Sequence, residues 1–561
     1  MQLRSKTTKL VARLRAEEGV TMLLALFVLV ITSAILSAAY VAVFSDTQPS
    51  RNDVDQGRAI AAAQAGIQAY NYQLNQNENY WQTCTPLGNT GAVGFNGTNG
   101  NGFVTVPGST DTGGGSESYY VKPVPAITAP STDNKCDPTN ALTTMIEGPT
   151  SGTSAGSFRI ASTGHSGNVT RTIVAQYKPP SFLNYVYYTD YETLDPSAQS
   201  GDPSDCEVHY PNRGSDCGGA ISFITGDSIN GPVHSEDTLA ICGNPVFGRT
   251  GDDDAVEAAA ASGASAGWYS SCGSSNPTFN TPSGAINTSS TSITPPSTNT
   301  SLLSVTQAAY HFTGKTTIVL SGSSMYVTNT ADRYTNKLLA DPSNGVVYVS
   351  TGSSGCGQTY DPFNPSYTAD TNCGNAYVSG TYNTSLTIAT DNDIIINGNI
   401  CTTTTVACTG TPTGNALLGL IANDFVRIYH PMDNASSDTS GGCTTTTGSG
   451  RSQTTVTASN ATGSLTDPTV YAAILAVNHS FIVDNYNCGD SLGTLNVYGA
   501  IAQLFRGTVG TESNGTVSTG YDKSYNYDDR LADEEPPYFL NPVSAQWFVS
   551  RQTECNSTTA C

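Results

Sequence analysis

Residues 385–400 read SLTIATDNDIIINGNI and consist of two short apolar runs joined by the polar corner DND. β-Branched side chains favour strands, whereas Asp and Asn favour turns, so the pattern predicts two short strands around one turn. The apolar residues that would share the inner face are Leu386, Ile388, Ile394, Ile396 and Ile400. If successive turns of the chain repeat this unit, these side chains stack into a continuous apolar column.

Further segments on both sides of this stretch show the same pattern, in which short runs of Val, Ile, Leu and Tyr are interrupted by Gly, Asn or Asp. They are residues 219–247, 315–329, 344–350, 415–431, 470–485 and 493–507. Short strands with such turns fit either a β-sandwich or a solenoid. The paired unit of residues 385–400 favours the solenoid. We therefore expect a mainly β protein with a right-handed parallel β-helix over residues 218–510.

The segments around these runs differ in character. Residues 273–301 and 434–464 are rich in Ser and Thr and too polar for an interior, so they predict surface loops. In residues 511–561 two prolines, Pro536 and Pro537, precede several aromatic residues. This segment should run back over the strands and cap their exposed edges.

A tyrosine-rich linker is expected over residues 181–217, where the aromatic residues are Tyr185, Tyr187, Tyr188 and Tyr191. Two interpretations stay open for these side chains. They form a platform on which a glycan stacks, or they pack at a junction between domains. Packing is the commoner role of aromatic residues in such a place.

Composition sets the class of protein. A chain of 561 residues has room for more than one domain, and 55 Gly with 12% charged residues are typical of an exported, turn-rich β protein. The 45 acidic and 23 basic residues give a formal charge of -22. That charge repels nucleic acid, so we expect no nucleic-acid partner.

The cysteines indicate an oxidising compartment. There are 14 of them, none before Cys84, and several lie close together in sequence. The spacing suggests the local disulfides Cys206–Cys217, Cys242–Cys272, Cys356–Cys373, Cys401–Cys408 and Cys555–Cys561. A bridge from Cys443 to Cys488 would tie down the second polar insertion. Because no cysteine or histidine pair has the CxxC or HxxxH spacing of a zinc site, we expect no metal.

The N-terminus predicts a long helix over residues 20–75. From Val20 to Phe44 the chain carries no charge over about 25 residues, and a helix of that length, about 37 Å, exceeds the roughly 30 Å hydrocarbon core of a bilayer. The basic residues ahead of it are Arg4, Lys6, Lys9, Arg13 and Arg15. By the positive-inside rule they keep residues 1–19 in the cytoplasm and place the remainder of the chain outside the cell.

The helical pattern continues past a break expected at Pro49. Its second half is amphipathic, because Ile60, Ala63, Ile67, Tyr70 and Leu74 recur at spacings of three and four residues. Residues 76–180 follow, with a Gly-rich loop and then alternating apolar and polar positions typical of half-buried antiparallel strands. We expect these strands to pack on the amphipathic half of the helix as an α+β head.

The leader ending in EEG at residues 17–19, the apolar helix directly after it and the amphipathic continuation resemble the N-terminus of type IV prepilins, especially PilX-like minor pilins. The resemblance implies that a prepilin peptidase cleaves between Gly19 and Val20, and that other pilin-like subunits bind the helix. Leu24 stands where major pilins carry a glutamate, which fits a minor or tip subunit better than a bulk fibre subunit. A single-pass anchor with a basic cytoplasmic tail is the alternative interpretation.

No catalytic motif is visible. The β-helix enzymes that cleave acidic polysaccharides use clustered carboxylates, for which the candidates are Asp252, Asp253, Asp254, Asp391, Asp393, Asp528 and Asp529. The DND corner is better explained as a turn, and the GDDDA motif as the N-cap of a helix that starts at Val256. Calcium at the corner is a weaker alternative, because a full calcium-binding repeat is missing. His234 and His430 have no visible nucleophile or second ligand and should be packed or hydrogen-bonded.

The sequence thus predicts a non-enzymatic minor pilin-like surface protein, without catalytic residues, cofactor or metal. It would be anchored in the cell membrane before assembly and would display a disulfide-stapled β-helix for pilus assembly or adhesion, with a surface glycan or another cell-surface ligand as partner. The alternative is a membrane-anchored β-helix enzyme acting on polysaccharide. A groove lined by Ser, Thr and aromatic residues would favour adhesion, whereas carboxylates beside a basic residue would favour the enzyme.

Overall fold

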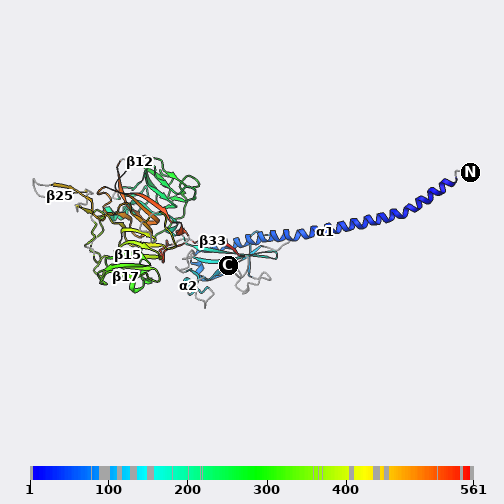
Figure 1. Cartoon of the computed structure of the whole chain (residues 1–561), viewed down its shortest axis with the longest axis horizontal. Helices are drawn as coiled ribbons and strands as arrows, with labels where there is room; N and C mark the ends of the chain where they lie inside the picture. Colours follow the sequence, from blue (N-terminus) through cyan, green and yellow to red (C-terminus); the bar gives the residue numbers. More distant parts are fainter. Residues whose placement is uncertain are drawn as a thin grey trace. The chain divides into compact units, whose positions relative to one another are not determined.

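The structure is a computed structural model of the whole chain (Figure 1). It describes residues 4–77, 79–87, 102–109, 117–126, 136–139, 141–147, 157–179, 181–199, 201–214, 217, 219–357, 359–363, 365–368, 371–402, 408, 410–433, 443–447, 454–513, 516–532, 534–543 and 547–555. The chain divides into two compact units. The helix–sheet unit comprises Met1–Val124, Arg159–Gln176 and Val549–Cys561, and the stacked-strand unit comprises Pro125–Phe158 and Tyr177–Phe548. The prediction of a mainly β protein is confirmed.

The helix–sheet unit begins with α1 (Arg4–Gln76). The break predicted at Pro49 is wrong, because α1 is continuous through this residue. A proline removes only one backbone hydrogen bond from a long helix, and helices often bend around such a loss without ending. Within the part of the chain that the structure describes, no helix combines the length and apolarity needed to cross a lipid bilayer.

The second half of α1 packs on an antiparallel sheet. The strands, in spatial order, are β1 (Val104–Thr105), β2 (Ser118–Val124), β3 (Phe158–Ser166), β4 (Val169–Lys178) and β33 (Phe548–Cys555). On the helix, Ala63, Ile67 and Leu74 are buried as the sequence pattern predicted. The Ser162 hydroxyl donates a hydrogen bond to the Ala63 carbonyl at 2.6 Å, which joins the sheet to the helix backbone. Gly164 permits this approach, since a Cβ there would collide with the backbone of Ala59.

Strand β33 corrects the prediction that all of residues 511–561 cap the β-helix. It lies beside β4 in the sheet of the helix–sheet unit. Ser550 Oγ donates to the Gln176 carbonyl at 3.3 Å, and Arg171 lies 3.5 Å from Glu554. The edge of β4 would otherwise present unpaired backbone groups, which a further strand satisfies.

The stacked-strand unit contains two series of parallel strands that follow the sequence. The first is β14 (His311–Thr313), β18 (Val346–Ser350), β20 (Leu386–Thr390), β22 (Leu418–Ala422), β28 (Thr469–Ala476) and β30 (Ser491–Arg506). The second is β15 (Thr316–Gly322), β19 (Ala376–Tyr382), β21 (Ile394–Thr402), β23 (Val426–Ile428) and β29 (Phe481–Val483). Each strand pairs with the next in its series. The pairings give a parallel stack, whereas its right-handed winding stays a prediction.

The DND corner joins β20 to β21 as the sequence predicted. All of the apolar residues assigned to the inner face, Leu386, Ile388, Ile394, Ile396 and Ile400, belong to one buried cluster that runs through the stack. Parallel pairing places equivalent residues of successive strands above one another, for example Leu386 opposite Leu418 and Ile394 opposite Val426. The core is therefore a column of stacked apolar side chains.

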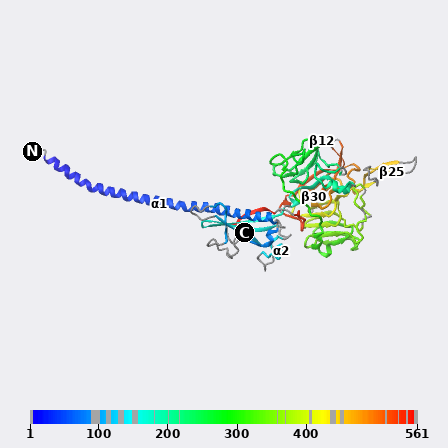
Figure 2. The same ribbon diagram turned by 180° about the vertical axis from the view of Figure 1, so that it is seen from behind.

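At one place in the stack, strands that are far apart in the sequence pair with each other, and we call this place the seam. There β5 (Tyr187–Leu194) pairs with β30, and β7 (Ser228–Asn230) pairs with β32 (Thr516–Tyr527), all in parallel. Beyond the seam, β8 (Val233–Ser235), β10 (Val246–Phe247), β11 (Val256–Ala258) and β13 (Thr278–Phe279) continue the stack. Figures 1 and 2 show β12 (Trp268–Ser275) on one side of this unit and the β15 end on the other, with β30 between them.

The seam changes two expectations. Residues 181–217, predicted as a linker, include β5, in which Tyr187 and Tyr188 are buried. The stack thus begins before residue 218 and, with β32, extends past residue 510. Residues 256–258, predicted to start a helix, form β11, because pairing with β8 buries Val256 and Ala258 in the core. Tertiary burial outweighs the helix propensity of the alanine-rich stretch.

Two segments cover the outward face of the strands. Ile293 comes from the first polar insertion and Leu302 directly follows it, whereas Leu531 and Phe539 come from the C-terminal segment. They share a buried cluster with outward side chains such as Leu417. Residues 528–543 therefore pack along the flank of the stack, where sequence analysis expected a cap over strand edges.

The structure joins five of the six cysteine pairs that the sequence suggested. Cα atoms are 5.0 Å apart in Cys206–Cys217, 5.3 Å in Cys242–Cys272, 4.5 Å in Cys356–Cys373 and 5.7 Å in Cys401–Cys408. The Cys443–Cys488 bridge, with Cα atoms 5.3 Å apart, ties the second insertion to the stack. Cys555 is disulfide-bonded, but Cys561, its suggested partner, lies outside the described residues.

Candidate functional site

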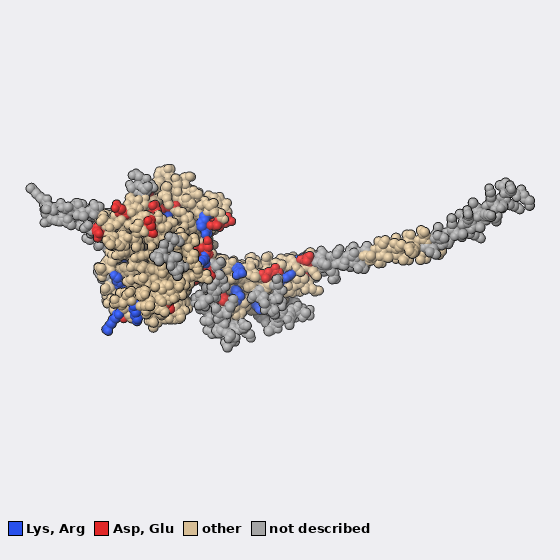
Figure 3. Space-filling view, viewed as in Figure 1, with Lys and Arg blue, Asp and Glu red and all other residues tan. Residues whose placement is uncertain are grey.

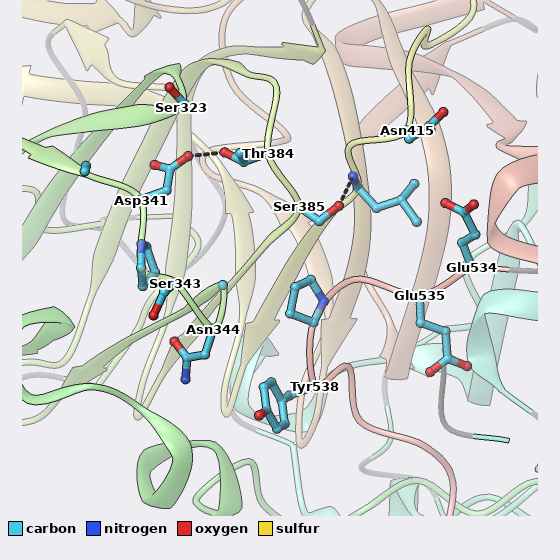
Figure 4. Close-up of a pocket in the computed structure, with 15 residues that line it drawn as sticks. Ser323, Asp341, Ser343, Asn344, Thr384, Ser385, Asn415, Glu534, Glu535 and Tyr538 are labelled. Atoms are coloured by element: carbon cyan, nitrogen blue, oxygen red, sulfur yellow. Dashed lines mark hydrogen bonds between the residues drawn. The ribbon is translucent and has the colours of Figure 1, made fainter. Parts of the chain in front are cut away.

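A groove of about 760 Å³ is hollowed into the stacked-strand unit (Figure 4). Its walls come from the turn at residues 340–345, from the start of β20 and from the C-terminal segment. The polar and aromatic lining residues are Ser323, Asp341, Ser343, Asn344, Thr384, Ser385, Asn415, Glu534, Glu535 and Tyr538. We call this feature the polar groove.

Asp341 lies on one wall of the polar groove. The Thr384 hydroxyl donates a hydrogen bond to Asp341 Oδ2, while Oδ1 is buried and has no hydrogen-bond partner among the described residues. Burial raises the pKa of Asp341, and the Thr384 hydrogen bond offsets part of this shift. Because Oδ1 is covered by the protein, a ligand in the groove would reach Asp341 through Oδ2, which can accept a second hydrogen bond.

Glu534 and Glu535 lie on the opposite wall (Figure 4). Glu535 is nearly buried, and its Oε1 lies 3.3 Å from Lys178 Nζ, so its charge is balanced. Burial nevertheless raises the pKa of Glu535, with the Lys178 charge opposing that rise. Glu534 is half-buried and makes no ion pair with a described residue. Tyr538 is 38% exposed and offers the groove an aromatic surface.

This set of groups suits a hydroxyl-rich ligand. Hydroxyls of Ser and Thr and amides of Asn can donate to or accept from sugar hydroxyls, and the carboxylate of Asp341 can accept from them. The Tyr538 ring can lie against an apolar sugar face. The carboxylates disfavour anionic ligands. The polar groove is therefore better matched to a neutral or cationic saccharide than to an acidic one.

The carboxylates of the DND corner are occupied by structural partners. Asp391 accepts hydrogen bonds from the Tyr348 hydroxyl at 2.6 Å and from the Thr351 backbone N–H at 2.8 Å. Asp393 accepts from Arg427 Nη1 at 2.8 Å and from the Phe425 N–H at 3.1 Å. These bonds fix the corner, as the turn interpretation predicted.

The other acidic candidates surround arginines. Arg249 lies 2.8 Å from Asp254, 3.3 Å from Asp252 and 2.8 Å from Asp529. Arg530 binds Asp528. None of these aspartates, nor Asp253, lines the polar groove.

Both histidines singled out in the sequence are buried and hydrogen-bonded. His234 Nε2 lies 2.9 Å from Glu236 and Nδ1 lies 2.9 Å from Glu257. Burial lowers the pKa of His234, but the hydrogen bonds and charges of the two glutamates outweigh it and raise this pKa. His430 Nδ1 lies 3.0 Å from the Asp484 carbonyl.

The sequence analysis missed the polar groove. Its residues come from separate parts of the chain, and Asp341 and Tyr538 have no spacing that marks a site. The Pro536–Pro537 pair indicated only an extended segment. In the described part of the chain no group of three or more His, Cys, Asp or Glu residues could hold a metal ion. Gly19 and Val20 lie within α1, and cleavage between them stays a prediction.

Comparisons with known proteins give little guidance. No protein-family model matches the chain, and no curated protein matches it. Among solved structures, the competence-associated pilin ComZ from Thermus thermophilus aligns at 12% identity over 89% of this chain and 97% of that chain, with a TM-score of 0.27. A likeness at this score carries no argument about fold or function.

Proposed function

We propose that the chain is a non-enzymatic, minor pilin-like surface protein that presents a right-handed β-helix and binds a surface glycan in the polar groove. In this proposal a prepilin peptidase removes residues 1–19, α1 holds the protein in the cell membrane before assembly, and other pilin-like subunits then bind the helix. The observation that carries the proposal is the difference between the two halves of α1.

The described side chains of the first half are exposed and apolar. Met22 is 72% exposed, Phe27 65% and Leu36 69%, and residues 20–44 contain no charged residue, so their described surface is tan in Figure 3. A helix that is apolar all round needs an apolar environment. A bilayer before assembly and neighbouring helices afterwards would each supply one.

The second half of α1 supports the same proposal. Ala59, Ala63, Ile67, Tyr70 and Leu74 are buried against the sheet of the helix–sheet unit. A plain membrane anchor explains the apolar first half and the basic leader, but it does not require this continuous amphipathic half packed on a sheet. The leader ending at Gly19 adds the resemblance to prepilins.

The non-enzymatic assignment is supported by the partners of the candidate carboxylates. Asp393 and Asp254 each bind an arginine, and Asp391 accepts two hydrogen bonds from the fold. The polar groove, with its hydroxyls, amides and exposed Tyr538, supports adhesion. The alternative is an anchored polysaccharide-cleaving enzyme, which would release new reducing ends from a polysaccharide that it binds.

The first experiment is N-terminal mass mapping of the protein from its native envelope and from sheared surface fibres. We expect a mature chain beginning at Val20 in the fibre fraction. Gly19→Val should block cleavage, whereas Gly57→Ala should leave it intact, since a Cβ at Gly57 meets no atom within 4 Å. An uncleaved chain confined to the membrane fraction would refute the pilin-like assignment and leave the anchor.

The adhesion part is tested by glycan-array binding of the full chain. We expect neutral or amino sugars to bind and uronic acids to fail. Tyr538→Ala and Asp341→Asn should each weaken binding about tenfold or more, corresponding to about 1.4 kcal/mol. Lys337→Ala, on the exposed strand β17 (Tyr334–Ala340), is the matched control. Equal binding by all of these variants would place the glycan elsewhere.

A further inference from the structure

A second cavity, of about 310 Å³, lies at successive corners of the parallel stack. Asn392 and Asp393 precede β21, Asp424 precedes β23, and His479 precedes β29. Because these strands are stacked in parallel, their corners lie above one another. Tyr360 and Phe425 supply aromatic walls. We call this cavity the corner pocket.

His479 is held in one orientation. Its Nδ1 lies 3.1 Å from Asp195 Oδ2, and its ring stacks on Phe425 with centroids 4.3 Å apart and planes 7° from parallel. Asp195 is buried and is itself fixed by the Ser480 hydroxyl at 3.0 Å and the Ser197 N–H at 2.9 Å. Nε2 of His479 has no hydrogen-bond partner among the described residues. Since His479 lines the cavity, this nitrogen is the donor left for a ligand.

Asp424 supplies the matching acceptor. Unlike Asp393, whose carboxylate is taken by Arg427 and the Phe425 N–H, Asp424 makes no ion pair with a lysine or arginine among the described residues. Burial and then the charge of Asp393 raise the pKa of Asp424 to about 6, so it is mostly ionised at neutral pH. Asn392 is its neighbour, and with the amide oxygen and nitrogen exchanged it donates to Asp424 Oδ2 at 2.8 Å.

The chemistry of the corner pocket selects a neutral ligand. Hydrogen bonds and the charge of Asp195, followed by that of Asp424, outweigh burial and raise the pKa of His479, which favours an imidazolium beside the Asp424 carboxylate. The positive charge of His479 and the negative charge of Asp424 largely cancel, so an ionic ligand gains little electrostatic attraction from the pocket. A vicinal diol can accept from one group and donate to the other, and the aromatic walls can contact its carbon skeleton.

We propose that the corner pocket is a second ligand site that binds the vicinal diol of a neutral sugar unit between Asp424 and His479 Nε2. Its volume lies at the lower end of the range for small-molecule sites, about 300–1,000 Å³, which suits a single unit better than a chain. The site is separate from the polar groove, and it depends on neither cleavage nor assembly of the chain.

The test is isothermal titration of the detergent-solubilised full chain with the methyl glycosides of glucose, galactose and mannose, and with glucuronate. We expect at least one neutral glycoside to bind and glucuronate not to bind. Asp424→Ala and His479→Ala should each weaken binding tenfold or more. Asp252→Asn, at an exposed aspartate outside the pocket, should leave it unchanged.

A second measurement needs no variant. Diethylpyrocarbonate acylates an imidazole only through its deprotonated fraction, so it should modify the minor neutral form of His479 at Nε2, and the bound glycoside should slow that modification, as followed by peptide mass spectrometry. Failure of all neutral glycosides to bind would overturn the proposal, as would binding that is insensitive to both variants and gives no protection of His479. Loss of binding in Tyr538→Ala with retention in Asp424→Ala would assign the sugar to the polar groove instead. These outcomes are independent of whether the chain enters a fibre.

Discussion

Replacing Arg506 by Met should open the seam. Arg506 Nη1 lies 2.8 Å from Glu192 Oε2, and the two side chains are 2% and 0% exposed. The guanidinium also lies 3.5 Å from the centroid of the Phe223 ring. After the substitution Glu192 still accepts a hydrogen bond from the Tyr187 hydroxyl at 2.8 Å but loses its ion-pair partner. Stranding a buried charge in this way costs about 3–5 kcal/mol.

Hydrogen exchange followed by mass spectrometry measures this cost locally. If β5 and β30 exchange through opening of the seam, their amides should exchange about two to three and a half orders of magnitude faster in Arg506→Met, since about 1.4 kcal/mol is a factor of ten. Lys337→Met, on exposed β17, should change exchange little. Unchanged protection of β5 and β30 in Arg506→Met would refute the assignment of the ion pair as a structural bond of the seam.

Three further predictions concern other parts of the stacked-strand unit. Replacing both Cys242 and Cys272 by Ser should lower the unfolding free energy by about 2–4 kcal/mol, measured by urea denaturation, and should have no effect under reducing conditions. His234→Gln should flatten the pH dependence of Tm. The raised pKa of His234 gives stability that is present below its ordinary value of 6.5 and is lost as pH rises through the folded pKa, so an unchanged slope above pH 6.5 would contradict the role of its two glutamates. Gly380→Ala should cost about 1–3 kcal/mol, because its φ of 107° is strained for alanine, and wild-type thermal stability would refute this.

The local β pattern could be predicted from the sequence because each paired unit encodes its own strands and turn. Residues 385–400 illustrate this, since alternation marks the inner face and DND marks the corner. The helix expected after Asp254 illustrates the limit. Alanines favour a helix in isolation, but the edge of β8 offers Val256 and Ala258 a buried strand position. Such a tertiary partner cannot be read from the segment itself.

The corner pocket could not be predicted for a related reason. His479 and Asp195 are separated by 284 residues, and they meet only because β5 joins the stack beside β30. Asp424 carries no sequence signal beyond a turn. In the polar groove, Asp341 and Tyr538 likewise meet only after the C-terminal segment folds along the flank. The candidate sites of this unit lie at contacts between distant segments, which single-sequence patterns do not encode.

Two of the buried ion pairs of the stack lie at the seam. Successive strands from β14 to β30 are tethered by the chain, so proximity selects their partners. At the seam the partners are distant in sequence, and the apolar surfaces alone would accept other strands. Two buried ion pairs, Arg506 with Glu192 and Lys523 with Asp227 at 2.8 Å, connect the two sides of this junction.

These pairs should therefore contribute specificity more than stability. In the double variant Arg506→Met, Glu192→Leu no charge is stranded, so most of the stability lost in Arg506→Met should return. The junction would then accept the equivalent strand of a second molecule, and swapped dimers should form on refolding at high concentration. Size-exclusion chromatography with light scattering would detect them. A double variant that regains stability and stays monomeric at every concentration would show that the strands select one another without the buried charges.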